Sequence, residues 1–255
     1  MKIAVITAMP EEFAAVARCM KSGEPSRLTG IRGLRSSAAG HDIVLVQSGM
    51  GFDNAARAAA AVIQEIRPDL VISVGFCGGI APELCVGDVI IAEHIVIATA
   101  HDVEPVPAGL SAIGSRLVDH LASKKVRATG GTFASTREIM SKAHLAGLLA
   151  NRYRNPVVEM ESGAIAQITS EHGTPLLAIR AVSDAANEEL GFALDEFCDP
   201  ELRRILIHKV LLTVLRKPRI IPQLMRLARG SRAAADGLSA ALACLFSLLE
   251  NASGQ

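Results

Sequence analysis

The chain has 255 residues, half of them hydrophobic and only 3% aromatic, with 26 basic and 26 acidic side chains. This length allows one large domain or two small ones, with a core that Ala, Val, Ile and Leu must build. The balanced charge argues against nucleic acid as the main partner. Five cysteines without CxxC spacing fit reduced thiols in the cytoplasm better than a disulfide framework or a zinc site.

Apolar runs alternate with segments of helical pattern along the first 182 residues. The expected strands are 2–8, 42–48, 70–74, 88–92, 95–98, 128–133, 157–160 and 176–182. The expected helices are 11–20, 54–66, 116–124, 141–151 and 162–172. This alternation predicts a three-layer α/β/α fold with a central mixed sheet. The N-terminal strand lacks the features of a signal peptide, and no apolar stretch free of charge is long enough to predict a membrane span.

Two glycine clusters follow apolar strands, one at 49–51 and one that comprises Gly75, Phe76, Cys77 and Gly78. Ligands of open α/β sheets bind at the carboxyl ends of strands, and glycine lets the backbone approach a ligand closely. Neither cluster fits the dinucleotide or phosphate-loop motif. The clusters therefore predict a binding site of another kind, and ordinary tight turns are the alternative.

An acidic pair, Glu159 and Glu161, flanks Met160 inside an apolar run. Carboxylates are seldom buried unless something pairs with them. Residues two apart on a strand share a face, so both acids are expected to point the same way. Two acceptor-only side chains suit a ligand with several hydroxyls, such as a sugar. An edge strand with acids facing water is the alternative.

The last strand carries Arg180 within it, and Ser183 and Asp184 follow at its end. A side chain just past a strand can reach into a cleft, although a helix N-cap would also explain Asp184. An unpaired arginine inside a strand is costly. Arg180 is therefore expected to face an acid, for which Glu12 and Glu161 are available.

Five segments occur in the order and spacing of one family: 8–12, 49–51, 74–79, 158–161 and 183–184. On these segments the chain resembles the purine nucleoside phosphorylase/uridine phosphorylase superfamily, most of all its methylthioadenosine/S-adenosylhomocysteine nucleosidases. The resemblance covers residues 1 to about 200, which we expect to form the catalytic domain. It implies a homodimer that binds a small nucleoside and needs neither cofactor nor metal.

The resemblance implies hydrolysis of the N-glycosidic bond of a 5′-modified adenosine. Asp184 would protonate or hydrogen-bond N7 of the purine as general acid. Glu12 would orient the attacking water, and Arg180 would lie near that water. The transition state would resemble an oxocarbenium ion, which a nearby anion stabilises.

The resemblance also implies which residues bind the ribose. Met160 would pack on the sugar and Glu161 would hold its hydroxyls, with Glu159 the weaker direct ligand. The glycine segment from Gly75 to Gly78 and Ser183 would line the rest of the substrate site.

Several positions depart from the family pattern. Ser73 and Phe76 stand where phosphorolytic members hold phosphate with an arginine and a hydroxyl, which favours hydrolysis. Phe76 also removes a hydroxyl that some hydrolytic members use near the water. Arg137 and Ile139 stand where nucleosidases carry an aspartate and a phenylalanine that stacks on the base, so aliphatic side chains would hold the base. Phosphate bound by Arg137 or Arg57 remains the alternative.

The C-terminal segment 201–255 is expected to be a basic amphipathic helical extension, with breaks at Pro218 and Pro222. Between residues 201 and 250 it holds nine basic and three acidic residues, a net charge of 9 − 3 = +6. Such helices can lie on an anionic membrane, here at its inner face, or pack on the domain. Members linked to hopanoid lipid biosynthesis have a similar tail, so an adenosyl lipid is an alternative substrate. A non-catalytic nucleoside-binding protein and a membrane-interaction module are also compatible with the sequence.

Overall fold

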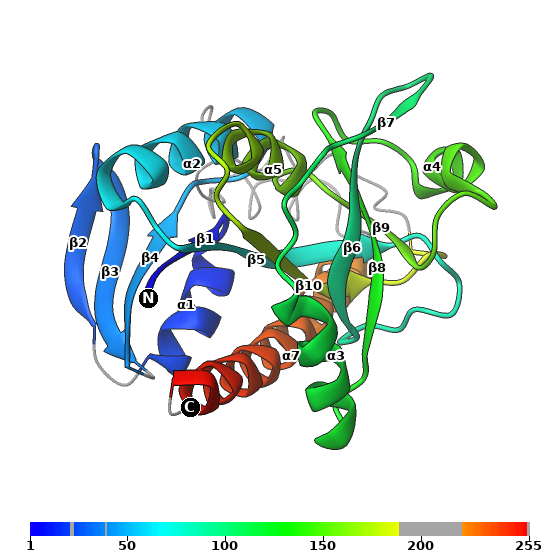
Figure 1. The fold of residues 1–255 in the computed structure, drawn as a ribbon. Coiled ribbons are helices and arrows are strands. Elements are labelled where there is room, and N and C mark those ends of the chain that lie inside the picture. The colour runs from blue at the N-terminus through cyan, green and yellow to red at the C-terminus, as the bar shows by residue number, and fades with distance from the viewer. Residues whose placement is uncertain (21–22, 39, 189–220, 254–255) are drawn as a thin grey trace.

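Ten strands form one mixed sheet in the computed structural model of the chain, which describes residues 1–20, 23–38, 40–188 and 221–253 (Figure 1). The strands are β1 Lys2–Thr7, β2 Glu24–Leu28, β3 Ile31–Ala38, β4 His41–Gln47, β5 Leu70–Gly79, β6 Val89–Ala98, β7 Val103–Pro105, β8 Ala128–Thr136, β9 Pro156–Glu159 and β10 Leu176–Asp184. The described helices are α1 Pro10–Cys19, α2 Phe52–Ile66, α3 Ile113–Ser123, α4 Lys142–Leu149, α5 Ser162–Glu171 and α7 Ile221–Ser253.

The sheet closes on itself at one end. Strand β10 pairs with β5 on one side and with β6 on the other, and β6, β8, β9 and β5 complete the ring through their own pairings. Strands β1, β4, β3 and β2 extend the sheet beyond β5. Because β5 and β10 run parallel, the glycine segment at the end of β5 lies beside the polar end of β10.

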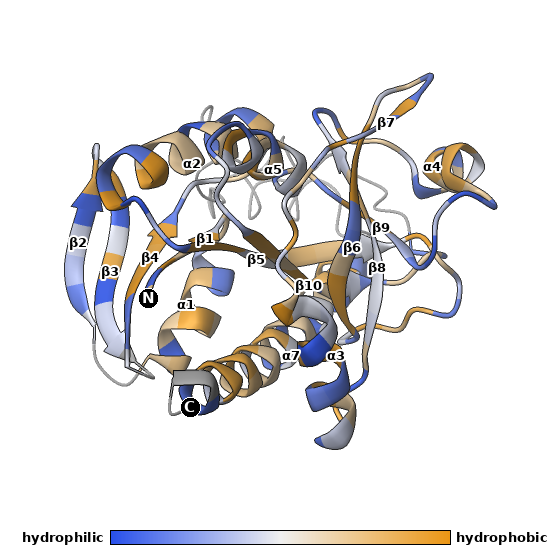
Figure 2. Cartoon of the chain, viewed as in Figure 1, coloured by the Kyte–Doolittle hydropathy of each residue, from blue (hydrophilic) through white to orange (hydrophobic). Residues whose placement is uncertain are grey.

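Helices cover both faces of this sheet, as the alternating pattern predicted. Helices α2 and α5 pack together on one face, and α1, α3 and α7 lie on the other (Figure 1). The side chains between the layers are mainly Ala, Val, Ile and Leu. Figure 2 shows the apolar central strands β1, β5 and β10, and a more polar hairpin of β2 and β3 at the edge. The predicted three-layer fold is therefore confirmed.

Strands β2, β3, β6 and β7 differ from the expected ones, and the three-residue strand β7 was not predicted. The hairpin of β2 and β3 was not predicted, because its strands alternate polar and small residues at a sheet edge and have no long apolar run. The two strands expected at 88–92 and 95–98 form one strand, β6. The register of β6 shifts between Ala92 and His94, so a β-bulge explains why the apolar pattern is interrupted there.

Helix α7 is part of the core of the protein. Its Leu238, Leu242 and Leu245 are buried in the same cluster as the strands and α1. A Cβ atom on Gly230 would overlap the carbonyl oxygen of Ser183, and one on Gly237 would lie 2.7 Å from the Gly87 oxygen. The expected helical extension therefore packs against the end of β10.

The path of this helix corrects part of the expectation. Pro222 is the second described residue of α7, and the helix runs on from it without a break to Ser253. Pro218 and the domain boundary at residue 200 lie outside the described residues.

By length and composition α7 is also a candidate membrane span, over Ile221–Asn251 with mean hydropathy 1.4 and 39% of that window buried, although no span was expected. A packed core helix meets the same criterion.

Candidate active site

The pairing of β5 with β10 arranges two polar clusters along one line. Gly75 lies opposite Arg180, and Gly78 lies opposite Asp184. Three residues of a strand span roughly 10 Å. The two clusters are therefore distinct and lie side by side along the ends of β5 and β10.

The first cluster surrounds Arg180, whose side chain is 2% exposed. Its Nη2 donates to Glu159 Oε2 at 2.6 Å and lies 3.8 Å from Glu161 Oε2. Glu12, on α1, is buried beside it. Three carboxylates thus share one guanidinium in a buried space, which we call the acidic cluster.

Backbone amides hold Glu12 in place. Its Oε2 accepts hydrogen bonds from the N–H groups of Ala8 and Met9, each at 2.9 Å, and its Oε1 accepts one from Phe76 at 2.8 Å. Glu12 is the third residue of α1, and the bond to Met9 is the backward half of a capping box. The start of the helix therefore aims this acid at the end of β5.

Glu159 is also fully engaged by protein groups. Its carboxylate accepts the N–H of Ser162 at 2.7 Å and the N–H of Glu161 at 3.1 Å, and the hydroxyl of Ser135 donates to Oε1. Glu161 accepts a hydrogen bond of 2.9 Å from the N–H of Gly51, the residue directly before α2. Glu161 is the less saturated acid of the two, and its side chain is 14% exposed.

The acids differ in their affinity for protons. Burial and the charge of Glu159 raise the pKa of Glu161 to about 7. Burial also raises the pKa of Glu12, although backbone hydrogen bonds and Arg180 oppose this effect. Burial pushes the pKa of Glu159 upward too, but Arg180 and the hydrogen bonds outweigh it, so that pKa is lowered. The cluster therefore favours any positive charge brought into it.

The second cluster lies at the end of β10. The register with β5 shifts between Val182 and Asp184, so Ser183 is the extra residue of a β-bulge. Its hydroxyl is 2.7 Å from Asp184 Oδ1, and Lys142 forms an ion pair with Oδ2. Lys142 also donates to the carbonyl oxygen of Asp184 at 3.2 Å. The bulge turns the acid away from the strand and toward the lysine.

The glycines of β5 make room for these side chains. A Cβ on Gly75 would lie 2.9 Å from Glu12 Oε1 and 3.3 Å from Arg180 Cζ. A Cβ on Gly78 would lie 2.9 Å from Lys142 Cε. The glycine segment was expected to let the backbone approach a ligand. In the structure it admits the protein's own charged groups.

The partner of Arg180 corrects the sequence analysis. Arg180 does face acids, but its close partner is Glu159, whereas Glu12 and Glu161 were the expected candidates. Glu159 and Glu161 do converge on Arg180. They converge because β9 ends at Glu159 and the chain turns into α5, so strand alternation is not the reason.

Other predicted residues take varied places. Phe76 contributes its N–H to the site while its ring packs in the core. Cys77 is buried, and its carbonyl oxygen lies 3.2 Å from the Ser183 hydroxyl. Met160 is half-buried between the two acids. Ile139 is 61% exposed, while its neighbour Met140 packs in a core cluster.

The side chain of Arg137 contacts the N-terminal turn of α2. It forms an ion pair with Asp53 at 3.1 Å, and its guanidinium lies 3.8 Å from the centre of the Phe52 ring. Nη2 of Arg57 donates to the side chain of Asn54. Both arginines considered for phosphate are thus engaged by residues of α2.

Lys142 and Ser135 were missed by the sequence analysis. Lys142 is the first residue of α4, directly after the N-cap Ser141. A cation there opposes the helix dipole, so its position was a signal that the side chain serves something outside the helix. Ser135 gave no such signal, because serine at a strand end is common in turns.

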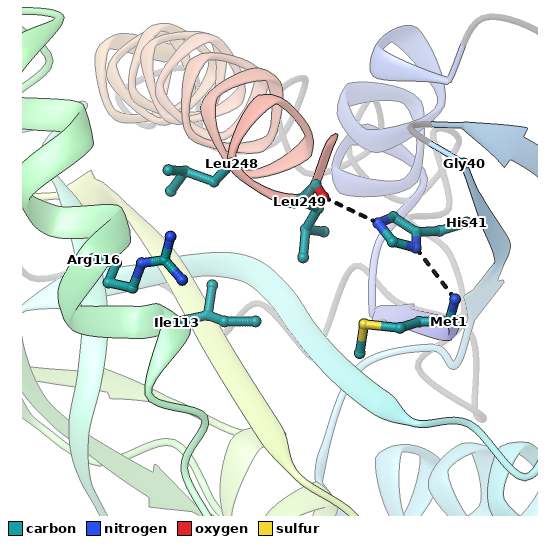
Figure 3. Close-up of a pocket in the computed structure, with 7 residues that line it drawn as sticks. All are labelled: Met1, Gly40, His41, Ile113, Arg116, Leu248 and Leu249. Carbon is teal, nitrogen blue, oxygen red and sulfur yellow. Dashed lines mark hydrogen bonds between the residues drawn. The ribbon is translucent and has the colours of Figure 1, made fainter. Parts of the chain in front are cut away.

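A separate pocket of about 420 Å³ lies at the opposite edge of the sheet, by the N-terminal ends of β1 and β4 (Figure 3). His41 bridges the N-terminal amine and the carbonyl oxygen of Leu249 there, with the ring nitrogens 3.3 and 3.5 Å from these atoms. The pocket contains none of the predicted site residues. Its lining is Met1, Gly40, His41, Ile113, Arg116, Leu248 and Leu249.

Known proteins resemble this chain in sequence and in fold. The sequence profile of the Phosphorylase superfamily matches residues 2–216. A 5′-methylthioadenosine/S-adenosylhomocysteine nucleosidase of Bacillus thuringiensis subsp. konkukian (strain 97-27) is 31% identical, over 78% of this chain and 92% of that protein.

Solved structures share the fold at lower identity. The nucleosidase of the same name from Colwellia psychrerythraea 34H, in complex with adenine, has a TM-score of 0.73 at 21% identity and covers 98% of this chain and 96% of its own. The Neisseria meningitidis nucleosidase, in complex with methylthio-immucillin-A, has a TM-score of 0.71 at 23% identity, over 96% of this chain and 97% of its own. With the profile match over most of its length, this chain belongs to the phosphorylase superfamily.

Proposed function

We propose that this protein is an N-glycosidase that hydrolyses a 5′-modified adenosine to free adenine and the corresponding ribose. The observation that carries the proposal is the acidic cluster, in which Glu12, Glu159 and Glu161 surround Arg180 about one nucleoside length from Asp184. The curated relatives are named as nucleosidases for methylthioadenosine and S-adenosylhomocysteine. Their name and the site chemistry support the same reaction.

The acidic cluster suits the sugar end of this reaction. As the glycosidic bond breaks, positive charge builds on the ribose, and buried carboxylates stabilise it. Glu161, with its pKa raised to about 7 and its partly open side chain, is the acid we assign to the ribose hydroxyls. Met160, beside it, would pack on the sugar.

Glu12 and Arg180 suit the water. A buried carboxylate with a raised pKa is a stronger base, and Glu12 is fixed by three backbone N–H groups. Nε of Arg180 is buried and has no hydrogen-bond partner within the described part of the chain. This donor can hold the water that Glu12 deprotonates.

Asp184 suits the base. It ends β10 on a bulge, with one carboxylate oxygen held by Ser183 and the other by Lys142. We assign it to N7 of the purine, where a proton makes adenine a neutral leaving group. Gly78 lies opposite it on β5, where a Cβ atom would come within 3.0 Å of Oδ2.

Electrostatics favour hydrolysis over phosphorolysis. Phosphate would have to enter a cluster of three acids and one arginine already paired with Glu159. The position of a family phosphate arginine is Ser73, which is buried with its hydroxyl 3.5 Å from that of Ser162. Water carries no charge and meets no such repulsion.

Adenine release tests the proposal. The purified protein is incubated with methylthioadenosine, adenosine and inosine, each with and without phosphate, and free base is measured by chromatography. We expect release from methylthioadenosine without phosphate, and less from inosine. Release only with phosphate would make the protein a phosphorylase. No release from any nucleoside would contradict the proposal.

We further propose that the enzyme is a cytoplasmic homodimer with peripheral membrane contact through its C-terminal segment. The cysteines of the described residues are free thiols, which supports a reducing compartment. Exposed Ile139 offers apolar surface for a second copy. Exposed Met225 and Ile221 lie among arginines at the start of α7, which supports contact with an anionic surface.

A further inference from the structure

We propose that Lys142 and Asp184 act as one proton-holding pair, in which Lys142 supplies the proton that Asp184 passes to the leaving base. This inference rests on the proposed function and names a residue that the reaction needs besides its direct contacts. Lys142 acts through Asp184, so it is a positioning and proton-holding residue.

The first observation is the saturation of the lysine. Lys142 is 8% exposed, and its ammonium contacts Asp184 Oδ2 and two backbone carbonyl oxygens, those of Asp184 at 3.2 Å and Ala185 at 2.6 Å. An ammonium has three hydrogen-bond donors, and three acceptors meet it. The side chain is therefore built into the site and is not a surface lysine folded inward by chance.

A second observation is where the chain places this cation. Lys142 begins α4, where the helix dipole disfavours positive charge. Glycine at position 78 leaves room for its side chain, because a Cβ there would lie 2.9 Å from Lys142 Cε and 3.0 Å from Asp184 Oδ2. The unfavourable helix dipole and the need for glycine at position 78 are thus both tolerated, and both accompany the contact between Lys142 and Asp184.

The hydrogen bonds of Asp184 decide where the proton resides. Its Oδ1 lies within hydrogen-bond distance of the Ser183 hydroxyl, and its Oδ2 contacts the ammonium. A carboxylate paired with an ammonium accepts at that oxygen and carries no proton there, whereas the single Ser183 hydroxyl proton can go either to Oδ1 or to the carbonyl oxygen of Cys77. In this ion pair the proton available for N7 is the one on the Lys142 ammonium.

Each proton that moves in the proposed reaction has a donor and an acceptor. The C1′–N9 bond breaks with its electron pair going to the base, and N7 takes a proton from Asp184 as Asp184 takes one from the Lys142 ammonium. Water bonds to C1′ and gives its proton to Glu12. Adenine and the ribose product leave with Lys142 neutral and Glu12 protonated. Exchange with solvent returns the proton from Glu12 to Lys142.

Other ionisable groups also face the pair. Glu188 follows β10 and accepts the N–H of Ala185 at 3.1 Å. Arg226 of α7 lines the same small cavity as Asp184 and Glu188. From β5 the nearest is Cys77, whose pKa is strongly raised by burial, so it stays a neutral thiol. None of these contacts replaces the lysine at Oδ2.

The test is the pH dependence of Lys142→Met. A carboxyl group alone holds its proton only in acid, near pH 4, whereas a lysine ammonium holds one to about pH 10. We expect kcat for methylthioadenosine to fall at least about 100-fold at pH 8 and to recover to within about 10-fold at pH 5. Lys142→Gln, which keeps a polar side chain, should behave alike and replaces the Met variant if that one folds poorly.

A second substrate separates chemistry from structure. Nitrophenolate leaves without protonation, so both Lys142 variants should cleave 4-nitrophenyl β-D-ribofuranoside within about threefold of the wild type. Ser141→Ala is the matched control. It removes the cap of α4 and lowers the melting temperature, but it keeps the lysine and should keep the wild-type pH profile.

The outcomes separate the inference from the proposed function. Equal losses on both substrates at every pH would make Lys142 merely structural and overturn the inference, as would a full rate at pH 8. A wild-type protein that releases no adenine at any pH would overturn the proposed function, and this inference with it.

Discussion

At the scale of single residues, the unusual feature is the imbalance of charge around Arg180. One guanidinium serves three buried carboxylates, so they cannot all be ionised without cost. Arg180 pairs closely with Glu159, whose pKa is lowered, and Glu161 is left with a raised pKa. The strain on Glu161 is relieved when a positive charge forms beside it, as in the proposed transition state.

Asp184→Asn should abolish turnover while the fold stays intact. The amide keeps the shape of the side chain but cannot pass a proton, and loss of a general acid costs about 10²–10⁴-fold in kcat. Initial rates of adenine release measure this, with circular dichroism to check the fold. Asp53→Asn is the matched control, because Asp53 is 90% exposed and forms an ion pair with Arg137 at 3.1 Å. A near-normal rate in Asp184→Asn would show that the acid was assigned wrongly.

Glu161→Gln should change how stability depends on pH. Below the ordinary glutamate pKa of 4.5 the carboxyl is protonated in both states, and its contribution is fully present. As the pH rises to about 7, the Glu161 carboxyl loses its proton in the unfolded chain but keeps it in the folded protein. The free energy of unfolding of the wild type therefore falls over this range. The amide of the variant does not ionise, so the variant has no such loss.

The variant should therefore gain on the wild type between pH 5 and pH 8, by on the order of 1–3 kcal/mol in the free energy of unfolding. Urea unfolding at the two pH values measures the difference. The exposed Glu171→Gln serves as control and should show no such gain. A difference between variant and wild type that stays constant with pH would contradict the shift in the pKa of Glu161.

At the scale of elements, α7 contacts the end of β10, the strand that carries Asp184. Gly230 touches the backbone of Ser183, the residue of the β-bulge that turns Asp184. The C-terminal helix therefore packs against the end of β10, where Ser183, Asp184 and Lys142 meet. The sequence left two alternatives for this segment, a membrane surface or packing on the domain, and the described helix packs on the domain.

Gly230→Ala should destabilise the protein and slow it, although alanine favours a helix by about 0.5–1 kcal/mol over glycine. The new methyl group overlaps the Ser183 carbonyl, and overpacking of this kind costs about 1–3 kcal/mol. Gly147→Ala on α4 is the control, because nothing lies within 4 Å of its Cβ, and it should stabilise the protein. Urea unfolding and kcat measure both variants. Equal stabilisation by the two substitutions would contradict the contact.

At the scale of the whole molecule, the two ends of the chain meet in one core. Helix α7 packs against α1 and β10, and the apolar side chains between them belong to a single cluster (Figure 1). Truncation before α7 is therefore expected to unfold the protein. An outer face remains at the start of the helix, where Arg226, Arg229 and Arg232 are exposed near Met225.

Vesicle binding tests the proposed role of this face. The protein should co-sediment with anionic vesicles at low salt and less so as salt rises, since each arginine contributes up to about 1 kcal/mol. Changing Arg226, Arg229 and Arg232 together to Gln should weaken binding. The same change at Arg27, Arg152 and Arg154, which are exposed elsewhere, removes equal charge and should not. Loss of binding in both triple variants would reduce the effect to net charge.

The sequence by itself predicted the layers of the fold and singled out the residues of a candidate site. Short apolar runs rich in β-branched residues and bounded by turn residues are typical of buried strands, so β1, β5, β8 and β10 were predictable from local pattern. The two acids around Met160 and the acid after β10 stood out because charged groups in apolar runs need a reason. The order of these segments was enough to indicate the family.

Only the tertiary structure decided which charges meet. Glu159 reaches Arg180, and Lys142 reaches Asp184, because the ring of β5, β10, β6, β8 and β9 brings separate segments to one edge. Local sequence shows that a buried charge needs a partner, but the register and closure of the sheet choose the partner. The burial of α7 was decided in the same way, since a basic amphipathic pattern fits a membrane surface and a protein core alike until the complementary face of the sheet is known.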